Sequence, residues 1–160
     1  MDGEERVVTQ RGLWFEEFEP GVVYRHAPGR TFGEADNTLF STLTMNPQAL
    51  HLDADWSSRQ PFGARLINSM MTLATLVGLS VDQLTQGTIV ANLGFSEVRF
   101  PAPMYAGDTL LAQTRVLATR PSASRPGEGV VTLEHTGHNQ HGAVTAVAVR
   151  AVMMRMTPDE

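Results

Sequence analysis

The chain has 160 residues, of which 42% are hydrophobic and 18% are charged, a composition typical of one globular domain with its own core. Its net charge is -5 and it contains no block of Lys or Arg, which argues against a nucleic-acid surface. Because it contains no Cys, disulfides, thiolate zinc sites and Cys nucleophiles are excluded.

The first residues of the chain give information about the cellular location of the protein. Met1–Glu5 is acidic, whereas a signal peptide begins with a basic region that continues into an apolar one. No run along the chain reaches the roughly 18 apolar residues that a membrane span needs. We therefore expect a cytoplasmic protein without a membrane partner.

Residues 1–12 are polar, and we interpret them as a flexible N-terminal arm in front of a single domain that covers 13–160. The domain is expected to open with a short strand over 22–26. This strand lies between two turn signals, Pro20-Gly21 and Pro28-Gly29.

A short amphipathic helix is predicted over 33–44, and Thr31 and Glu34 have the spacing of a capping box at its start. A loop that carries His51 and Asp53 follows, and either Asp53 or Asp55 is a candidate cap for a helical turn through Trp56, Ser57 and Ser58. The apolar positions at helical spacing are Phe32, Ala35, Leu39, Phe40 and Leu43.

The longest apolar segment runs from Met70 to Leu84 and predicts a long central helix. Its apolar residues cover nearly the whole circumference, which is typical of a helix buried on most sides. Asn68 or Ser69 is its natural N-cap residue. Gly78 lowers helix propensity by roughly 1 kcal/mol relative to Ala, and suggests close packing on a sheet.

Four segments after this helix have the composition of strands, and Pro- or Gly-containing turns separate them. Short links between consecutive strands favour an antiparallel meander, so the fold class is α+β. An apolar helix with such a sheet indicates the hot-dog architecture, in which the sheet rolls around the helix. One copy leaves an edge strand and one side of the helix open, which favours a homodimer. The predicted strands cover 88–100, 109–119, 129–136 and 143–154.

Two neighbouring stretches carry the candidate chemistry. Asn46–Asp53 places an amide, an imidazole and a carboxylate in a Pro-containing loop. Asn68–Leu73 opens the apolar helix, whose first turn offers unpaired backbone N–H groups. A proton-transfer group beside an oxyanion-binding helix end suits chemistry next to a carbonyl.

Each of these candidate residues is also compatible with a purely structural role. His51 is also compatible with a loop histidine that bonds a backbone carbonyl, and Asn46 with local turn chemistry before Pro47. Ser69 is also a plain N-cap candidate, although a cap uses the hydroxyl whereas oxyanion binding uses the N–H.

Metal and cofactor sites are not expected. His135 and His138 face opposite sides of a strand, and His141 falls in the following turn, so the three do not converge on a metal ion. The chain contains neither the Gly-x-Gly-x-x-Gly fingerprint of dinucleotide binding nor a P-loop.

Several stretches taken together resemble the MaoC-like dehydratases, the hot-dog-fold (R)-specific enoyl-CoA hydratases. The resemblance runs from about residue 13 to the C-terminus and depends on the order and spacing of the pieces. The stretches that carry it are Gly29–Asp36, Asn46–Asp53, Asn68–Met70, Val98–Pro103 and Gly107-Asp108.

The resemblance implies roles for three residues. In that family an Asp, three intervening residues and Leu-His form the hydratase signature, which places His51 on the catalytic His. Asn46 occupies the position of the catalytic Asp, a departure, because an amide cannot accept a proton at neutral pH. The backbone N–H of Ser69 would bind the thioester oxygen, and Asn46 would hold the water.

The expected substrate is an acyl-CoA thioester, contacted by Asn68 and Met70 of the first helical turn. Arg99, Arg120 and Arg125 are candidates for the CoA phosphates. Thr44–Pro47 and Asn68–Met70 resemble one branch of the family, some members of which hydrate branched C5-dicarboxyl-CoA thioesters of the mesaconyl or itaconyl type. A hot-dog acyl-CoA thioesterase and a non-catalytic acyl-CoA-binding subunit remain open as alternatives.

Overall fold

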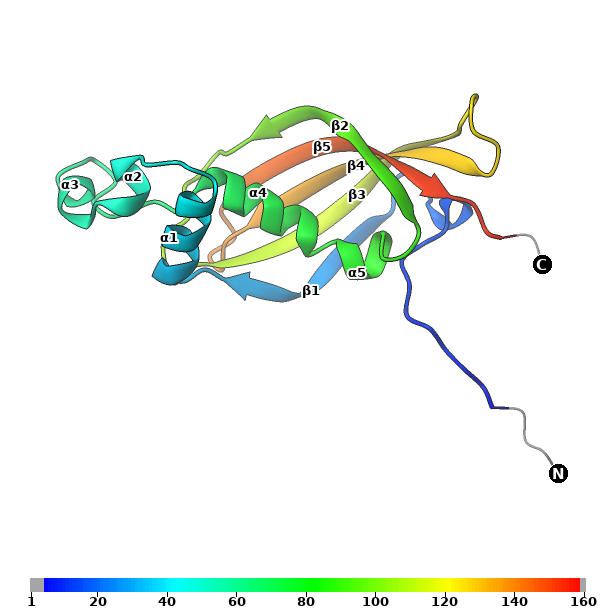
Figure 1. Cartoon of the computed structure of the whole chain (residues 1–160), viewed down its shortest axis with the longest axis horizontal. Helices are drawn as coiled ribbons and strands as arrows, with labels where there is room; N and C mark the ends of the chain where they lie inside the picture. Colours follow the sequence, from blue (N-terminus) through cyan, green and yellow to red (C-terminus); the bar gives the residue numbers. More distant parts are fainter. Residues whose placement is uncertain (1–4, 159–160) are drawn as a thin grey trace.

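A five-stranded antiparallel sheet with the strand order β1-β3-β4-β5-β2 forms the frame of the protein (Figure 1). The structure is a computed structural model that describes residues 5–158, so residues 1–4 of the predicted arm lie outside the described part. Each predicted strand is present, although the first is longer than expected because it continues through Pro28 to Thr31. The strands are β1 (Val23–Thr31), β2 (Ile89–Arg99), β3 (Thr109–Pro121), β4 (Glu128–His138) and β5 (Val144–Arg155).

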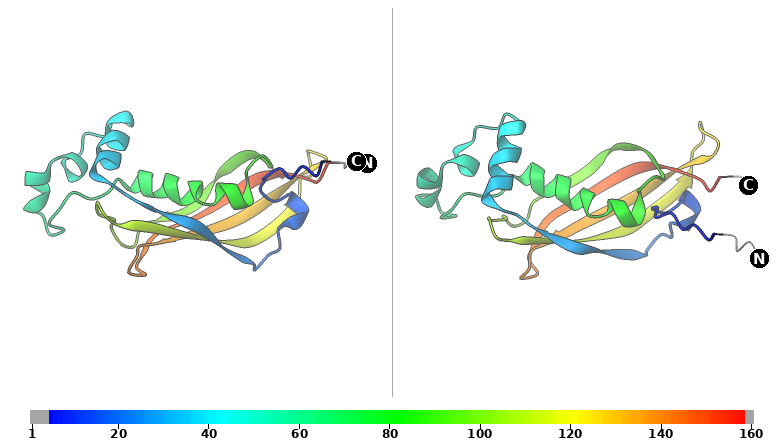
Figure 2. Two further views of the ribbon diagram at one scale, coloured as in Figure 1. Left: turned by 90° about the horizontal axis from the view of Figure 1, so that it is seen from below. Right: turned by 60° about the horizontal axis from the view of Figure 1, so that its bottom comes forward.

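The central helix α4 lies in the concave face of this sheet, and the expected hot-dog arrangement is confirmed (Figure 2). The helices α1, α2 and α3 form a group beyond one end of the sheet (Figures 1 and 2). No helix in the described part of the chain combines the length and apolar character that crossing a membrane requires. The helices are η1 (Phe15–Glu17), α1 (Glu34–Leu43), α2 (Ala49–Leu52), α3 (Ala54–Ser58), α4 (Ser69–Gly78) and α5 (Val81–Leu84).

The central helix is shorter than predicted. It ends at Gly78, where helix propensity is low, and the hydroxyl of Ser80 donates to the carbonyl of Val77 at 2.7 Å before α5 begins. A Cβ at Gly78 would meet nothing within 4 Å, so the close packing expected there is absent. Met70 and Ala74 form an exposed stripe with Gly78, so the helix is buried on one side only.

The start of α1 differs from the predicted capping box. Thr31 still belongs to β1, and Gly33 is the N-cap residue. The carboxylate of Asp36 accepts the N–H of Gly33 at 2.7 Å, whereas the carboxylate of Glu34 pairs with Arg65 at 3.0 Å.

The face of α1 that packs inward also differs from the predicted one. Leu39 and Leu43 are 59% and 74% exposed, although their apolar spacing predicted burial. Asn37 and Ser41, one turn apart, are the buried residues of the helix. The inward face of α1 therefore combines Phe40, which packs against the apolar core, with two buried polar side chains that contact the segments carrying the candidate chemistry.

Two apolar clusters fill the concave face of the sheet. One lies under α4 and the other lies under α5 and the N-terminal segment, and together they form the core. The first consists of Phe32, Ile67, Met71, Leu76, Met104, Leu110, Ala112 and Ala146, and the second of Phe18, Leu84, Val116, Val131, Leu133, Val152 and Met154.

A row of buried polar side chains crosses four strands of the sheet and ends on α5. Nε of Arg150 donates to Nε2 of His135 at 2.8 Å, so the other ring nitrogen, Nδ1, carries the proton and donates to Thr114 Oγ1 at 2.7 Å. The hydroxyl of Thr114 donates to Nε2 of His26 at 2.8 Å, and His26 Nδ1 donates to Gln83 at 2.8 Å. Every hydrogen bond in the row therefore points the same way.

This direction requires both histidines to be neutral. Burial lowers the pKa of His135 to about 3, and the charge of Arg150 acts in the same direction. Burial also lowers the pKa of His26. Both ring nitrogens of His135 are thus hydrogen-bonded within the core.

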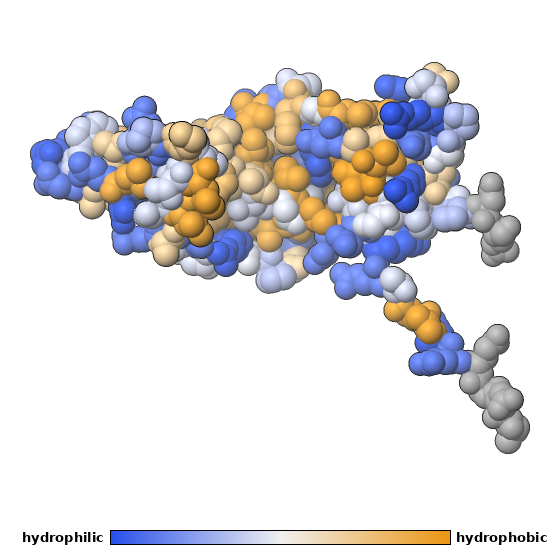
Figure 3. Space-filling view, in the orientation of Figure 1, coloured by the Kyte–Doolittle hydropathy of each residue, from blue (hydrophilic) through white to orange (hydrophobic). Residues whose placement is uncertain are grey.

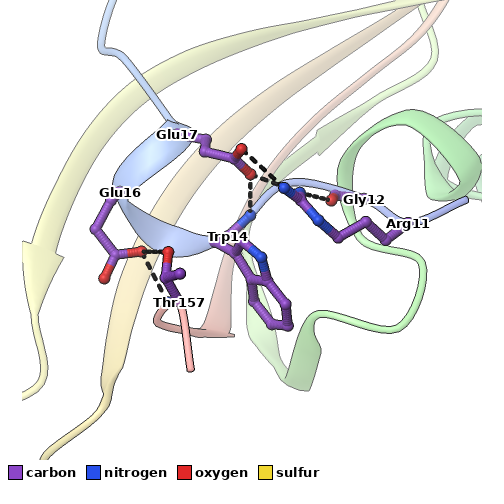
Figure 4. Close-up of polar contacts among 6 residues, drawn as sticks. All are labelled: Arg11, Gly12, Trp14, Glu16, Glu17 and Thr157. Carbon is purple, nitrogen blue, oxygen red and sulfur yellow. Dashed lines mark hydrogen bonds and ion pairs between the residues drawn. The ribbon is translucent and has the colours of Figure 1, made fainter. Parts of the chain in front are cut away.

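The N-terminal segment attaches to the domain from Arg11 onward (Figure 4). Arg11 forms an ion pair with Glu17 at 2.6 Å, and the N–H of Trp14 donates to the same carboxylate at 2.7 Å. The N–H of Gly12 donates to the carbonyl of Gln86 at 2.8 Å. Residues 5–10, by contrast, extend away from the sheet (Figure 1).

Candidate functional site

A cavity of about 400 Å³ opens where α2, the start of α4 and the segment after β2 meet. Its wall is mainly apolar, with a few polar side chains among aliphatic and aromatic ones. Such a lining is typical of a site for a small organic ligand that a few polar groups orient. The lining residues are Leu50, His51, Phe62, Leu66, Ile67, Ser69, Thr72, Phe100, Ala102, Pro103, Met104 and Thr145.

His51 lies in this cavity and is buried. The sequence predicted a loop here, but His51 belongs to the four-residue helix α2, which follows the break at Pro47. The next helix, α3, begins as predicted, with the carboxylate of Asp53 accepting the N–H of Trp56 at 2.9 Å.

One ring nitrogen of His51 is fixed by a backbone contact. Nδ1 lies 2.8 Å from the carbonyl oxygen of Leu66. Because a carbonyl only accepts hydrogen bonds, Nδ1 carries the proton and Nε2 of the neutral ring has a free lone pair. Within the part of the chain that the structure describes, Nε2 makes no hydrogen bond. The ring is thus held in the tautomer that accepts a proton at Nε2.

The start of α4 forms another part of the cavity wall. Asn68 is the N-cap residue, since its side-chain oxygen accepts the N–H of Met70 at 3.0 Å, and its amide nitrogen donates to Ser41 Oγ at 3.2 Å. The N–H of Ser69 donates no hydrogen bond to any described residue, and Ser69 lines the cavity. A free N–H with the partial positive charge of a ten-residue helix suits a developing oxyanion.

Asn37 connects these two parts of the site, and the sequence did not single it out. Its amide nitrogen donates to the carbonyl of Leu66 at 2.9 Å and to the carbonyl of His51 at 3.3 Å. Its amide oxygen accepts the N–H of Asn68 at 2.8 Å. The only signal in the sequence was a polar pair one turn apart, Asn37 and Ser41, in a helix with a clear apolar pattern.

Asn46 does not reach the cavity with His51. Its side-chain oxygen accepts the N–H of Gln48 at 3.2 Å, which is the local turn chemistry that the sequence left open. It lines a separate, open depression together with Met45, Pro47 and Leu52. In this structure the side chain of Asn46 therefore holds the local turn and does not line the cavity that contains His51.

The candidate groups for binding CoA are widely separated. Arg99 pairs with Glu97 at the end of β2, next to Phe100 of the cavity wall. Arg120 is the next-to-last residue of β3, and Arg125 lies in the following connection, at the opposite end of the sheet from α2 (Figure 1). Of these three arginines, Arg99 alone is adjacent in the chain to a residue of the cavity wall.

Two further polar residues of the cavity were missed by the sequence reasoning. Thr72 lies one turn into α4, and Thr145 lies at the start of β5. Their hydroxyls have only long contacts, at 3.5 Å to the carbonyl of Asn68 and at 3.4 Å to the carbonyl of Gly137. No local pattern marks them, because the fold alone brings β5 beside the start of α4. Among the described residues no group of three or more His, Asp and Glu side chains converges on a metal position.

Known proteins resemble the chain in sequence. It is 30% identical over 147 residues to a mesaconyl-CoA hydratase of Cereibacter sphaeroides, and 32% identical over 148 residues to a beta-methylmalyl-CoA dehydratase of Chloroflexus aurantiacus. Both alignments cover 92% of this chain but only 42% and 41% of the relatives. The chain therefore spans about two fifths of the length of these curated relatives.

The fold and the sequence profile agree with this likeness. The crystal structure of the MaoC-like dehydratase from Rhodospirillum rubrum superposes with a TM-score of 0.81 at 30% identity, covering 92% of this chain and all of that one. The profile of the MaoC like domain matches residues 16–139, which is most of the chain. The protein belongs to the MaoC-like domain family.

Proposed function

We propose that the protein is an (R)-specific enoyl-CoA hydratase, which adds water to the double bond of an enoyl thioester or removes it in reverse. The observation that carries this proposal is the pairing of two groups in one cavity. They are the buried His51, whose Nε2 is free to accept a proton, and the unpaired N–H of Ser69 at the start of α4. The names of the two relatives, a hydratase and a dehydratase of CoA thioesters, support it.

The geometry suggests how the chemistry proceeds. Nε2 of His51 removes a proton from water while the water oxygen bonds to the β-carbon of the enoyl group. The electron pair of the double bond moves to the thioester oxygen, and the Ser69 N–H with the α4 N-terminus stabilises this enolate. The protonated ring then returns its proton to the α-carbon. Because Asn46 lies outside the cavity, His51 carries out both proton transfers in turn.

The size and lining of the cavity support a short acyl group. A space of about 400 Å³ with a mainly apolar wall suits a small hydrocarbon chain attached to the thioester. Thr72 and Thr145 line the same space, and hydroxyl groups of this kind suit an additional polar group on the acyl chain. We therefore propose a branched C5-dicarboxyl-CoA of the mesaconyl type as the substrate to test first.

A homodimer belongs to the same proposal, as does the cytoplasmic location expected from the sequence. β2 is an edge strand, and apolar side chains gather over β2, α4 and α1 on one face (Figure 3). An exposed edge of this kind favours pairing with a second copy. Phe100 lies both beside this edge and in the cavity wall, so the second copy would sit next to the site. The exposed apolar residues of this edge are Leu93, Phe95, Val98 and Phe100.

Parallel assays of two products distinguish the candidate activities. Crotonyl-CoA and mesaconyl-CoA are incubated with the protein while enoyl absorbance and free thiol are both recorded. Hydration removes the absorbance without releasing thiol, which is the result that the proposal predicts. Thiol release at the same rate would instead identify a thioesterase. Binding of both thioesters, measured as a raised melting temperature, without loss of either signal would identify a non-catalytic subunit.

A further inference from the structure

Asn37 is a buried amide whose three hydrogen bonds all go to the backbone of the candidate site. Its nitrogen donates to the carbonyls of Leu66 and His51, and its oxygen accepts the N–H of Asn68. These partners determine which way the amide points. In the flipped orientation its oxygen would face two carbonyls and its NH₂ group would face an N–H, leaving all three contacts repulsive.

The first consequence concerns the base. The carbonyl of Leu66 accepts both Nδ1 of His51 at 2.8 Å and the amide of Asn37 at 2.9 Å. A carbonyl oxygen has two lone pairs, so both bonds form at once. Asn37 thereby fixes the acceptor that decides the tautomer of His51, and its second N–H holds the backbone of the same histidine.

The second consequence concerns the oxyanion donor. By accepting the N–H of Asn68, the oxygen of Asn37 fixes the residue from which α4 starts. Asn68 in turn caps Met70, so the position of the first turn, including the Ser69 N–H, depends on this contact. The side chain of Asn37 therefore contacts both Leu66, which bonds the ring of His51, and Asn68, which precedes the Ser69 N–H.

We propose that Asn37 is a positioning residue: it fixes the position of the proton-accepting nitrogen of His51 relative to the Ser69 N–H. The inference rests on the proposed hydratase function for its kinetic consequence. The predicted tautomer of His51, however, is a property of the folded protein and is measured without any substrate.

Two variants separate the contacts of Asn37. Asn37→Leu removes all three hydrogen bonds at similar volume. Asn37→Asp keeps an acceptor for the N–H of Asn68 and loses at least one of the two donors, because a carboxyl carries one O–H when protonated and none when ionised. Thr114→Val is the matched control, because it also removes a buried hydrogen-bonding group but lies in the polar row of the core.

The decisive readout is the ¹⁵N spectrum of the histidine rings, with the His51 signals assigned from a His51→Gln sample. The native protein and Thr114→Val are expected to show His51 protonated at Nδ1, whereas both Asn37 variants shift it toward a mixture of tautomers. In the hydration assay kcat is expected to fall about 10- to 100-fold with a smaller change in KM, since a small misplacement of a catalytic group costs this much.

Each outcome decides one of the two proposals. An unchanged His51 spectrum in a folded Asn37→Leu or Asn37→Asp protein overturns the positioning role, as does an equal loss of kcat in Thr114→Val. If Asn37→Leu does not fold, Asn37→Asp provides the answer. A native protein without hydration activity overturns the proposed function, and the spectra then still decide what Asn37 does.

Discussion

Nδ1 of His51 lies 2.8 Å from the carbonyl oxygen of Leu66, fifteen residues later in the chain. This single contact selects the ring nitrogen that is free to react. It also ties the short helix α2 to the segment that leads into α4. The segment at Leu66 therefore positions both the proton acceptor and the N-terminus of α4.

Replacement of Ser69 by proline tests the oxyanion donor directly. Ser69 is the first residue of α4, a position where proline is well tolerated, and Asn68 before it already has the extended backbone that proline favours. Ser69→Pro therefore keeps the helix but removes the N–H, and we expect kcat to fall by about 10²–10³-fold. Ser69→Ala, which keeps the N–H and loses only the hydroxyl, is expected to retain most activity. Equal rates for Ser69→Pro and Ser69→Ala would contradict the role of the N–H.

The predicted dimer can be tested at the edge of the sheet. Phe95 on β2 and Leu117 on β3 are both 41% exposed, so they form a matched pair. The native protein is expected to have twice the 17.5 kDa mass of the chain in sedimentation equilibrium. Phe95→Lys places a charge in the expected interface and should yield monomers, whereas Leu117→Lys should leave the dimer intact. Dimers of unchanged affinity in Phe95→Lys would exclude pairing through β2.

The buried polar row predicts a loss of stability in acid. The pKa of His135 is lowered to about 3 and that of His26 is lowered as well, while both titrate near about 6.5 in the unfolded chain. The unfolded state therefore binds protons that the folded state does not. The stability contributed by neutral His135 and His26 is complete above about pH 6.5 and is lost as the pH falls toward 3.

Urea unfolding across this pH range measures the effect. Each neutral buried histidine contributes a slope of up to about 1.4 kcal/mol per pH unit, so His26→Gln should lower the acid dependence of the unfolding free energy. His141→Gln, in an exposed turn, should leave the slope as it is in the native protein. The same slope in all three proteins would show that His26 takes up no proton on unfolding.

Two glycines are expected to respond in opposite directions to alanine. A Cβ at Gly129 would lie 2.3 Å from the ring of Phe15, so Gly129→Ala should lower the unfolding free energy by about 1–3 kcal/mol through overpacking. At Gly78 a Cβ meets nothing and the backbone is helical, so Gly78→Ala should raise it by about 0.5–1 kcal/mol. Both changes are read from urea unfolding curves, and a stabilised Gly129→Ala would contradict the packing of Phe15 on β4.

The regular parts of the fold were predictable from local patterns. Strand residues alternate because one side of the sheet faces the core, and this periodicity is visible without knowing the partner strands. The apolar segment after Asn68 likewise identified the helix that the sheet surrounds. Its early end at Gly78 was not predicted, because apolar residues continue through α5 and hide the break.

The contacts that hold His51 and Ser69 in place were not predictable from local sequence patterns. Leu39 and Leu43 suggested the wrong inward face for α1, because that face is set by contacts with residues such as Asn68, 31 positions after Asn37. The direction of Asn46 depends on the backbone turn after α1 rather than on residue type. Sequence spacing identified His51 and Ser69 as candidates, while the amide that joins them appears only in three dimensions.

The most direct test of the proposed chemistry compares two histidine variants in the hydration of crotonyl-CoA and mesaconyl-CoA. His51→Gln removes the proton acceptor, and we expect kcat to fall by about 10²–10⁴-fold, the usual contribution of a general base. His141→Gln removes an exposed histidine and should match the native rate. A His51→Gln protein as active as the native one would show that His51 is not the base.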